Sequence, residues 1–229
     1  MQSRNGGFAA FDVDNTYGYI NHIPFAAGHR AMIDPPSEDT SGRVLAFLGI
    51  LGRPRDCAAI RRCTGYLKRM QQPDGAFWGR WGANYIYGTW TVLSALSLAG
   101  EDMSQPWIRK AVSWLKSKQH PDGGWGETCN SYHVPNLRGT NNGISLPETT
   151  AWAMLALLSA GARKSAAVES AVSYLLSAQE ADGYWRHTDF NAANIPNFNY
   201  AKYHGYSLYF PLLALVSYRL MSIPTKAKS

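Results

Sequence analysis

The phrase Gln-x-x-Asp-Gly-x-aromatic occurs three times in this chain of 229 residues, beginning at Gln71, Gln119 and Gln179. Each copy follows a segment whose apolar residues recur at three- and four-residue spacing, which is typical of a helix that buries one face. The Asp-Gly pair supplies a residue that tolerates positive φ where a helix ends. We also expect the aromatic residue of each phrase to cover the helix end, with the Gln amide against its ring. The predicted amphipathic helices cover residues 57–71, 106–119 and 166–179.

A more apolar segment follows each phrase, and all-round hydrophobicity indicates helices that are buried on both sides. These segments lie at residues 87–100, 147–161 and 205–220, with an earlier one at 39–52. In the earlier segment Asp39 or Thr40 is placed to cap the helix. Alternating amphipathic and apolar helices, repeated about every fifty residues, predict an all-α fold: an α/α toroid, or partial α/α barrel, with the apolar helices inside. No strand pattern competes with this fold.

We assign residues 1–229 to one domain, which we expect to be an incomplete barrel. The stretch NGGFAAF at residues 5–11 resembles the tail of a further phrase whose preceding helix is not in the chain. A helical repeat cut at that point exposes an apolar edge that normally meets the next unit. The sequence therefore predicts either a fragment or a chain whose remaining units lie elsewhere.

Composition excludes several other classes of protein. The net charge of +6 is spread over short clusters, so nucleic acid is not an expected partner. A solvated basic surface is the first interpretation of this charge, and weak attraction to an anionic membrane surface is the second. No apolar run reaches the ~18 residues that a membrane-spanning helix needs. Cys57, Cys63 and Cys129 are irregularly placed and are expected to be reduced thiols, as in a cytoplasmic protein.

The repeated phrases resemble the QW motifs of triterpene cyclases. Four further stretches resemble the C-terminal third of squalene-hopene cyclases: FDVDNTYGYINHIPF, DPPSEDTSGRVL, GRWGANYIYGT and DGGWGETCNSY. The resemblance extends over nearly the whole chain. It implies a cyclase in which a carboxylic acid protonates a folded polyprene such as squalene and a cation passes from ring to ring. Aromatic side chains suit this chemistry independently, because a π-face stabilises positive charge without reacting, by about 0.5–2 kcal/mol per ring.

The resemblance also implies roles for particular residues. Asp39 and Arg43 match a pair behind the catalytic acid, and Tyr87 matches a Tyr beside it. The implied substrate-binding residues are Trp81, Phe11, Phe25, Phe198, Tyr203 and Tyr206. Trp81 matches a residue that lines the cavity, and Phe25 matches a loop near the substrate entrance. Ile195 and Asn199 stand where relatives place Phe, with Phe198 as the candidate substitute, so the late ring closures and the product are left open.

The acid motif DxDD of the family does not occur in this chain. The similar DVDN at residues 12–15 accompanies DxDD in the family and is interpreted as structural. We therefore expect the chain to be inactive alone and to act with an N-terminal cyclase part, or through self-association. The expected location is the cytoplasm, with peripheral contact to a membrane.

Two alternatives remain open at this point. The first is a non-catalytic isoprenoid-binding module built from a partial toroid. The second is a relative of the β-subunit of protein prenyltransferases, which bind zinc on the same fold. For zinc the chain offers Glu127, Cys129, His133 and the distant His204. Zinc takes such ligands, but their spacing is not diagnostic, and we expect neither a metal nor another cofactor.

Overall fold

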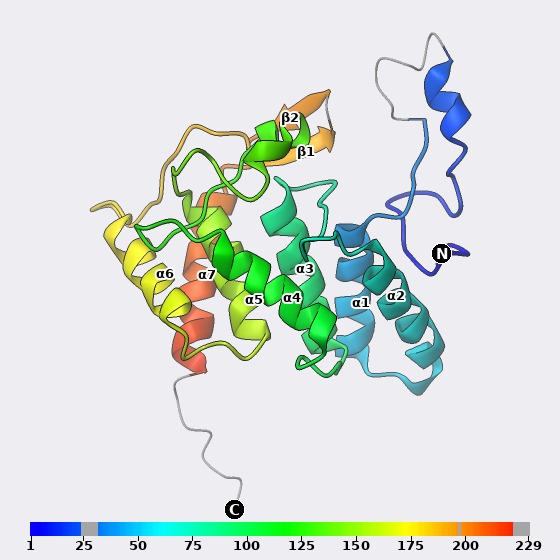
Figure 1. Cartoon of the computed structure of the whole chain (residues 1–229), viewed down its shortest axis with the longest axis horizontal. Coiled ribbons are helices and arrows are strands. Elements are labelled where there is room, and N and C mark those ends of the chain that lie inside the picture. Colours follow the sequence, from blue (N-terminus) through cyan, green and yellow to red (C-terminus); the bar gives the residue numbers. More distant parts are fainter. Residues whose placement is uncertain (24–31, 197, 222–229) are drawn as a thin grey trace, which may run out of the picture.

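The computed structural model describes residues 1–23, 32–196 and 198–221, and within these residues the regular secondary structure is helical apart from one short hairpin (Figure 1). The inner helices are α1 (Glu38–Leu51), α3 (Tyr85–Leu98), α5 (Pro147–Ser159) and α7 (Tyr206–Leu220). The outer helices are α2 (Cys57–Met70), α4 (Pro106–Ser117) and α6 (Ala166–Ser177). Helix α1 packs on α3, α3 on α5 and α5 on α7, while α2, α4 and α6 pack on α1, α3 and α5, respectively. This succession of helix pairs confirms the predicted α/α toroid.

Burial separates the central inner helices from the outer ones as the sequence predicts, but the inner helices α1 and α7, which were also expected to be buried on both sides, bury only five of fourteen and four of fifteen residues. Helix α5 buries twelve of its thirteen residues, whereas α4 buries five of twelve along one stripe. Helices α1 and α7 stand at the two ends of the arc, each packed on a single inner neighbour, and both leave large apolar side chains exposed. None of the helices in the described part of the chain has the length and hydropathy to cross a bilayer.

The repeated phrases form one turn geometry. In each, a side-chain oxygen of the Asp or Asn accepts a hydrogen bond from the backbone N–H two residues on, as in Asp74 with Ala76. The following glycine has positive φ in every copy, from 86° at Gly183 to 109° at Gly75, a conformation that glycine adopts without steric cost. The indole N–H of Trp125 donates to the carbonyl of Leu115 at 2.8 Å, which confirms that the ring covers the helix end.

The Gln amide makes specific hydrogen bonds across the turn. Gln71 Nε2 donates to the carbonyl of Gly75 at 2.9 Å, and the corresponding bonds recur at Gln119 and Gln179. Gln2 donates to Gly6 in the same way at 2.7 Å. The first phrase therefore begins at Gln2, which the sequence interpretation missed because no helix precedes it in the chain.

A two-stranded antiparallel hairpin corrects the expectation that the fold has no strands. It consists of β1 (Ala192–Ile195) and β2 (Asn199–Ala201), and Ala192 also bridges to Gly82. The N–H of Ala193 donates to the carbonyl of Trp81 at 3.2 Å. The hairpin therefore supports the loop that carries Trp81, at the end of the molecule where α3 begins.

Candidate functional site

Seven aromatic side chains from the inner helices and the loop before α7 form a continuous group, which we call the ring cluster. Its members are Tyr87, Trp90, Trp152, Tyr203, Tyr206, Tyr209 and Phe210. Trp90 and Trp152 are stacked with their ring centroids 6.0 Å apart, and Tyr206 meets the edge of Trp152 at 5.8 Å. Tyr203 lies 5.0 Å from Tyr206 and extends the cluster toward solvent. The cluster arises because α3, α5 and α7 each place aromatics near their N-terminal ends.

Arg43 faces this cluster from α1. Its guanidinium lies 4.7 Å from the ring centroid of Trp90 and 5.7 Å from that of Tyr87. Its Nη2 donates to the hydroxyl of Tyr87 at 3.4 Å. A guanidinium at this distance from an indole face is attracted by the ring quadrupole. Burial raises the pKa of Tyr87, and the nearby charge of Arg43 opposes that rise, so the Tyr87 phenol is held in its neutral, donor-competent form.

Asp39 serves a different purpose from the predicted helix cap. The helix begins at Glu38, and the buried Asp39 carboxylate reaches across to the loop before α3. Its Oδ2 accepts hydrogen bonds from the backbone N–H groups of Arg80 and Trp81, each at 2.9 Å. Its Oδ1 accepts from Ser37 Oγ at 2.6 Å. Burial raises the pKa of Asp39, and these donated hydrogen bonds oppose the rise.

Tyr132 contacts the same loop through the loop's carbonyl groups. The Tyr132 hydroxyl lies 2.5 Å from the carbonyl oxygen of Gly79 and 2.9 Å from that of Gly82. The loop is therefore fixed through its N–H groups by Asp39 and through its C=O groups by Tyr132. Gly82 has room only for a hydrogen, because a Cβ there would lie 2.4 Å from the Tyr87 ring. Trp81 is thus placed on a rigid loop beside Tyr87.

Glu38 is a buried carboxyl group that sequence reasoning did not single out. It is 3% exposed and stands next to Asp39 in the first turn of α1. Burial raises the pKa of Glu38 to about 8, and the Asp39 carboxylate adds to the rise. Asp39 beside it is also acidic, so the local composition does not indicate that Glu38 is buried. Only the position of Glu38 in the helix register indicates that its side chain points inward.

The structure brings some predicted site residues together and separates others. Arg43, Tyr87, Tyr203 and Tyr206 all belong to or touch the ring cluster. Trp81 pairs instead with Phe11, edge to face at 6.1 Å, and the neighbouring Gly82 of its loop lies against the Tyr87 ring. Phe198 is half exposed at the hairpin turn, and Phe25 lies outside the described residues. The predicted roles of these residues remain predictions.

Four members of the ring cluster were missed by sequence reasoning. They are Trp90, Trp152, Tyr209 and Phe210. Each lies in an apolar helix, where an aromatic ring is indistinguishable from ordinary core by composition alone. A helical spacing of three or four from a predicted site residue, as in Tyr87 to Trp90 and Tyr206 to Tyr209 or Phe210, was the available signal.

The candidate zinc ligands have separate partners. Glu127 accepts hydrogen bonds from the backbone N–H groups of Ile86 and Gly139 at 2.7 and 2.9 Å. Cys129 lies against the carbonyl oxygens of Phe190 and Ala192, and His133 Nε2 is 2.6 Å from the Tyr200 hydroxyl. Across residues 1–23, 32–196 and 198–221, no three His, Cys, Asp or Glu side chains are grouped as a metal site. Cys57, Cys63 and Cys129 are free in the structure.

Solved structures with a similar helix arrangement include two terpene cyclases. A variant of the type II terpene cyclase MstE from Scytonema, in complex with geranylgeranyl dihydroxybenzoate, matches with a TM-score of 0.66 at 19% identity. That match covers 96% of this chain and 64% of the other. The ent-copalyl diphosphate synthase of Streptomyces platensis matches with a TM-score of 0.62 at 22% identity, covering 94% and 36%. At these identities the matches show the fold alone.

Sequence comparison identifies the family. Residues 1–220 match the family model of the squalene-hopene cyclase C-terminal domain. The chain is 48% identical over 219 residues to the squalene–hopene cyclase of Alicyclobacillus acidocaldarius, covering 96% of this chain and 34% of that protein. It is 47% identical over 220 residues to the probable squalene–hopene cyclase of Sinorhizobium fredii, with 96% and 34% coverage. The chain belongs to the squalene-hopene cyclase family and spans about one third of the length of these relatives.

Proposed function

We propose that this chain forms the C-terminal part of a triterpene cyclase cavity, in which squalene or a related polyprene is protonated and cyclised through carbocations. The observation that carries the proposal is the ring cluster, in which seven aromatic side chains meet at the ends of consecutive inner helices. Rings in mutual contact offer a cation several π-faces in succession, and they contain no strong nucleophile that would end the reaction early.

Exposed apolar side chains continue from this cluster along the two end helices. Phe47 and Ile50 follow Arg43 at helical spacing on α1, and both are more than half exposed. Leu213, Val216 and Leu220 follow Tyr209 on α7, and each is at least 43% exposed. Residues at these spacings share one face of a helix. The two stripes support an apolar surface for a polyprene chain that another part of the cyclase encloses.

Asp39, Arg43 and Tyr87 are proposed to position the catalytic acid rather than to supply it. The Arg43 guanidinium and the neutral Tyr87 phenol both offer hydrogen-bond donors, and such donors orient a neighbouring carboxyl group. The acid itself is proposed to come from a DxDD segment on the N-terminal cyclase part. The Arg43 guanidinium already lies over the Trp90 ring. In this proposal the rings of Tyr203 and Tyr206 therefore stabilise the positive charge of the carbocation.

We also propose a cytoplasmic location with peripheral membrane contact, because a substrate such as squalene resides in a bilayer. The positive net charge of +6 supports weak attraction to an anionic surface. This contact requires no spanning helix.

A chimera tests the proposed function. Residues 1–220 of this chain replace the matching third of the Alicyclobacillus cyclase, which is 48% identical there, and squalene turnover is followed by gas chromatography and mass spectrometry. The proposal predicts polycyclic triterpenes from the chimera and none from this chain alone. A folded chimera that binds squalene without converting it would instead favour the non-catalytic isoprenoid-binding module. Polycyclic product from the isolated chain would contradict the proposed need for a separate acid.

A further inference from the structure

Three of the four Gln side chains reach an outer helix, and the fourth does not. Besides its own turn, Gln2 donates to the carbonyl of Ala59 in α2 at 3.0 Å. Gln71 donates to Trp107 in α4 and Gln119 to Ala167 in α6, each at 2.8 Å. Gln179 is exposed and, in the part of the chain that the structure describes, donates only within its own turn, to Gly183.

The glycines of the phrases divide in the same way as the Gln side chains: the first three lie against an outer helix, and the fourth lies against none of the described helices. A Cβ at Gly6 would lie 2.5 Å from the carbonyl oxygen of Arg62, because the backbone of α2 presses against that glycine. A Cβ at Gly75 would lie 2.7 Å from the carbonyl oxygen of Lys110 in α4. A Cβ at Gly123 would lie 2.6 Å from the carbonyl oxygen of Ser170 in α6. At Gly183 a Cβ would meet only Gln179 Nε2, at 3.9 Å, among the residues that the structure describes, so none of the described helices covers this glycine.

The three covered turns bind their helices in one register. The carbonyl that accepts from Gln and the carbonyl that lies over Gly are three residues apart in every case. The pairs are Ala59 with Arg62, Trp107 with Lys110, and Ala167 with Ser170. Three residues correspond to nearly one helical turn. Each of these three phrases therefore contacts the backbone of an amphipathic helix near its N-terminus, through main-chain carbonyls rather than through the side chains of that helix.

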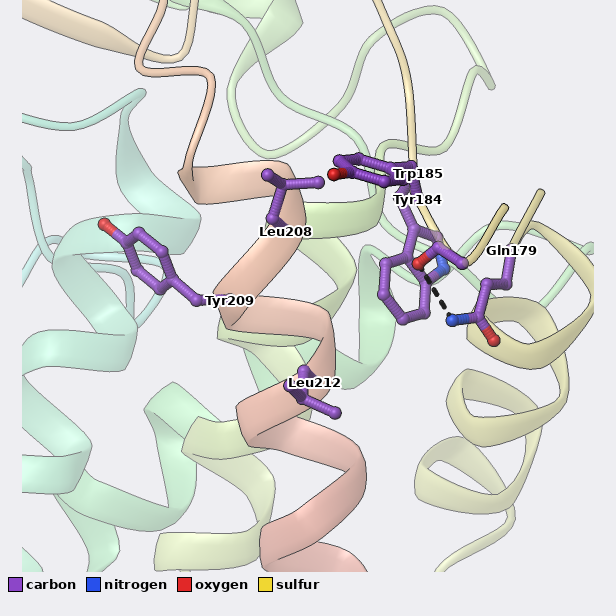
Figure 2. A pocket seen from close by; sticks show the side chains of 7 residues that line it. Gln179, Tyr184, Trp185, Leu208, Tyr209 and Leu212 are labelled. Atoms are coloured by element: carbon purple, nitrogen blue, oxygen red, sulfur yellow. Dashed lines mark hydrogen bonds between the residues drawn. The ribbon is translucent and has the colours of Figure 1, made fainter. Parts of the chain in front are cut away.

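An open groove occupies the corresponding place at the fourth phrase. It has a volume of about 400 Å³ and is bordered by Gln179, Gly183, Tyr184, Trp185, Leu208 and Leu212 (Figure 2). Tyr209 also lines the groove, and Figure 2 shows Leu212 on the side of α7 that faces α6. Leu212 is 57% exposed. The groove thus combines a backbone-recognising turn with an apolar helix face.

We infer that this groove binds an amphipathic helix of the same kind as α2, α4 and α6, carried by another polypeptide segment. The helix presents two main-chain carbonyls one turn apart to Gln179 and Gly183, and it lays an apolar stripe on Leu208 and Leu212. A second copy of this chain is not the occupant, because each of its three outer helices already lies against a phrase of its own. The inference depends on the repeat geometry and not on the proposed function.

Peptide binding tests the inference. The probes are three helix-stapled peptides with the sequences of residues 57–70, 106–118 and 165–178, added to ¹⁵N-labelled protein. At least one peptide is expected to shift the side-chain amide of Gln179 and the backbone amide of Gly183 in a saturable manner. No shift at these two groups with any of the three peptides would overturn the inference. If these two amide signals instead shifted with protein concentration in the absence of peptide, the occupant of the groove would be a second copy of the chain. That result would also overturn the inference.

A pair of glycine variants supplies the control. Gly183→Asn keeps a residue type that tolerates positive φ and places a side chain where the helix backbone would lie. Gly161→Asn makes the same change at a second glycine of positive φ, 74°, with nothing within 4 Å of its Cβ position. Peptide affinity is expected to fall at least tenfold in Gly183→Asn and to stay within twofold in Gly161→Asn. Equal affinity in both variants would contradict the assigned groove.

Discussion

The carboxylate of Asp39 accepts a hydrogen bond from the backbone N–H of Trp81 at 2.9 Å, across 42 residues of sequence. The same oxygen accepts from Arg80, so one buried side chain on α1 fixes the loop that precedes α3. Family resemblance placed Asp39 behind a catalytic acid, and the geometry adds a structural role at the same position. The two roles predict different consequences of substitution.

Replacing Asp39 by Asn is expected to lower the free energy of unfolding by about 2–4 kcal/mol. Asn has one acceptor oxygen in place of two, so Ser37 or the N–H groups of Arg80 and Trp81 lose their partner in a buried place. Urea denaturation of the purified chain measures the loss. The control is Asp12→Asn, whose carboxylate is exposed and accepts from Asn15, with an expected change below about 0.5 kcal/mol. Equal losses in the two variants would show that Asp39 does not hold the loop.

Glu38 is expected to make the chain less stable as the pH rises. Its folded pKa of about 8 lies above the ordinary value of 4.5, so between these two values the folded state binds more protons than the unfolded state. Stability contributed by the neutral carboxyl is present below pH 4.5 and is lost as the pH rises toward 8. The slope reaches at most about 1.4 kcal/mol per pH unit.

Urea unfolding at pH 5 and pH 8 isolates this effect through Glu38→Gln, which is neutral at both values. The wild type is expected to lose more stability between the two pH values than Glu38→Gln does. Glu101→Gln, at a less buried glutamate, serves as the matched control and should follow the wild type. An identical pH dependence in wild type and Glu38→Gln would contradict the raised pKa.

The helical repeat could be predicted from the sequence because two independent signals agree. Apolar periodicity separates the outer from the inner helices, and the Asp-Gly turns mark where the outer ones end. The hairpin at Ala192–Ala201 could not, because strands of four and three residues have too few positions to show alternation. The burial of Glu38 and the reach of Asp39 also escaped prediction, since both depend on contacts with residues about forty positions away.

The candidate site was predicted only in part, for a related reason. Tyr87, Tyr203 and Tyr206 were recognisable through the family resemblance, and they do lie in one group of rings. Trp90 and Trp152 complete that group, but the sequence alone does not distinguish them from core residues. They are recognised only when the packing of the helices is known. Trp81 and Phe11 form their own pair because Asp39 and Tyr132 determine the course of the loop.

Equivalent glycine substitutions are expected to have unequal costs. Gly75→Asn forces a Cβ to within 2.7 Å of the carbonyl of Lys110, and overpacking against backbone should lower the free energy of unfolding by about 2–3 kcal/mol. Gly183→Asn meets open space at a similar φ, so its cost should stay below about 1 kcal/mol. Thermal or urea unfolding of both variants checks the difference. Equal costs would refute the assignment of Gly75 as the contact point of α4.

The central claim is that the rings of this chain stabilise positive charge on an apolar ligand. The most direct measurement is the affinity of the chimera for two matched polyprenes, one ending in a trimethylammonium group and the other in a neutral tert-butyl group, by isothermal titration calorimetry. We predict that the ammonium ligand binds about 5–30-fold more tightly, corresponding to about 1–2 kcal/mol from desolvated π-faces, and that Tyr206→Leu reduces this preference. Equal affinity for the two ligands, or a preference unchanged by Tyr206→Leu, would contradict the claim.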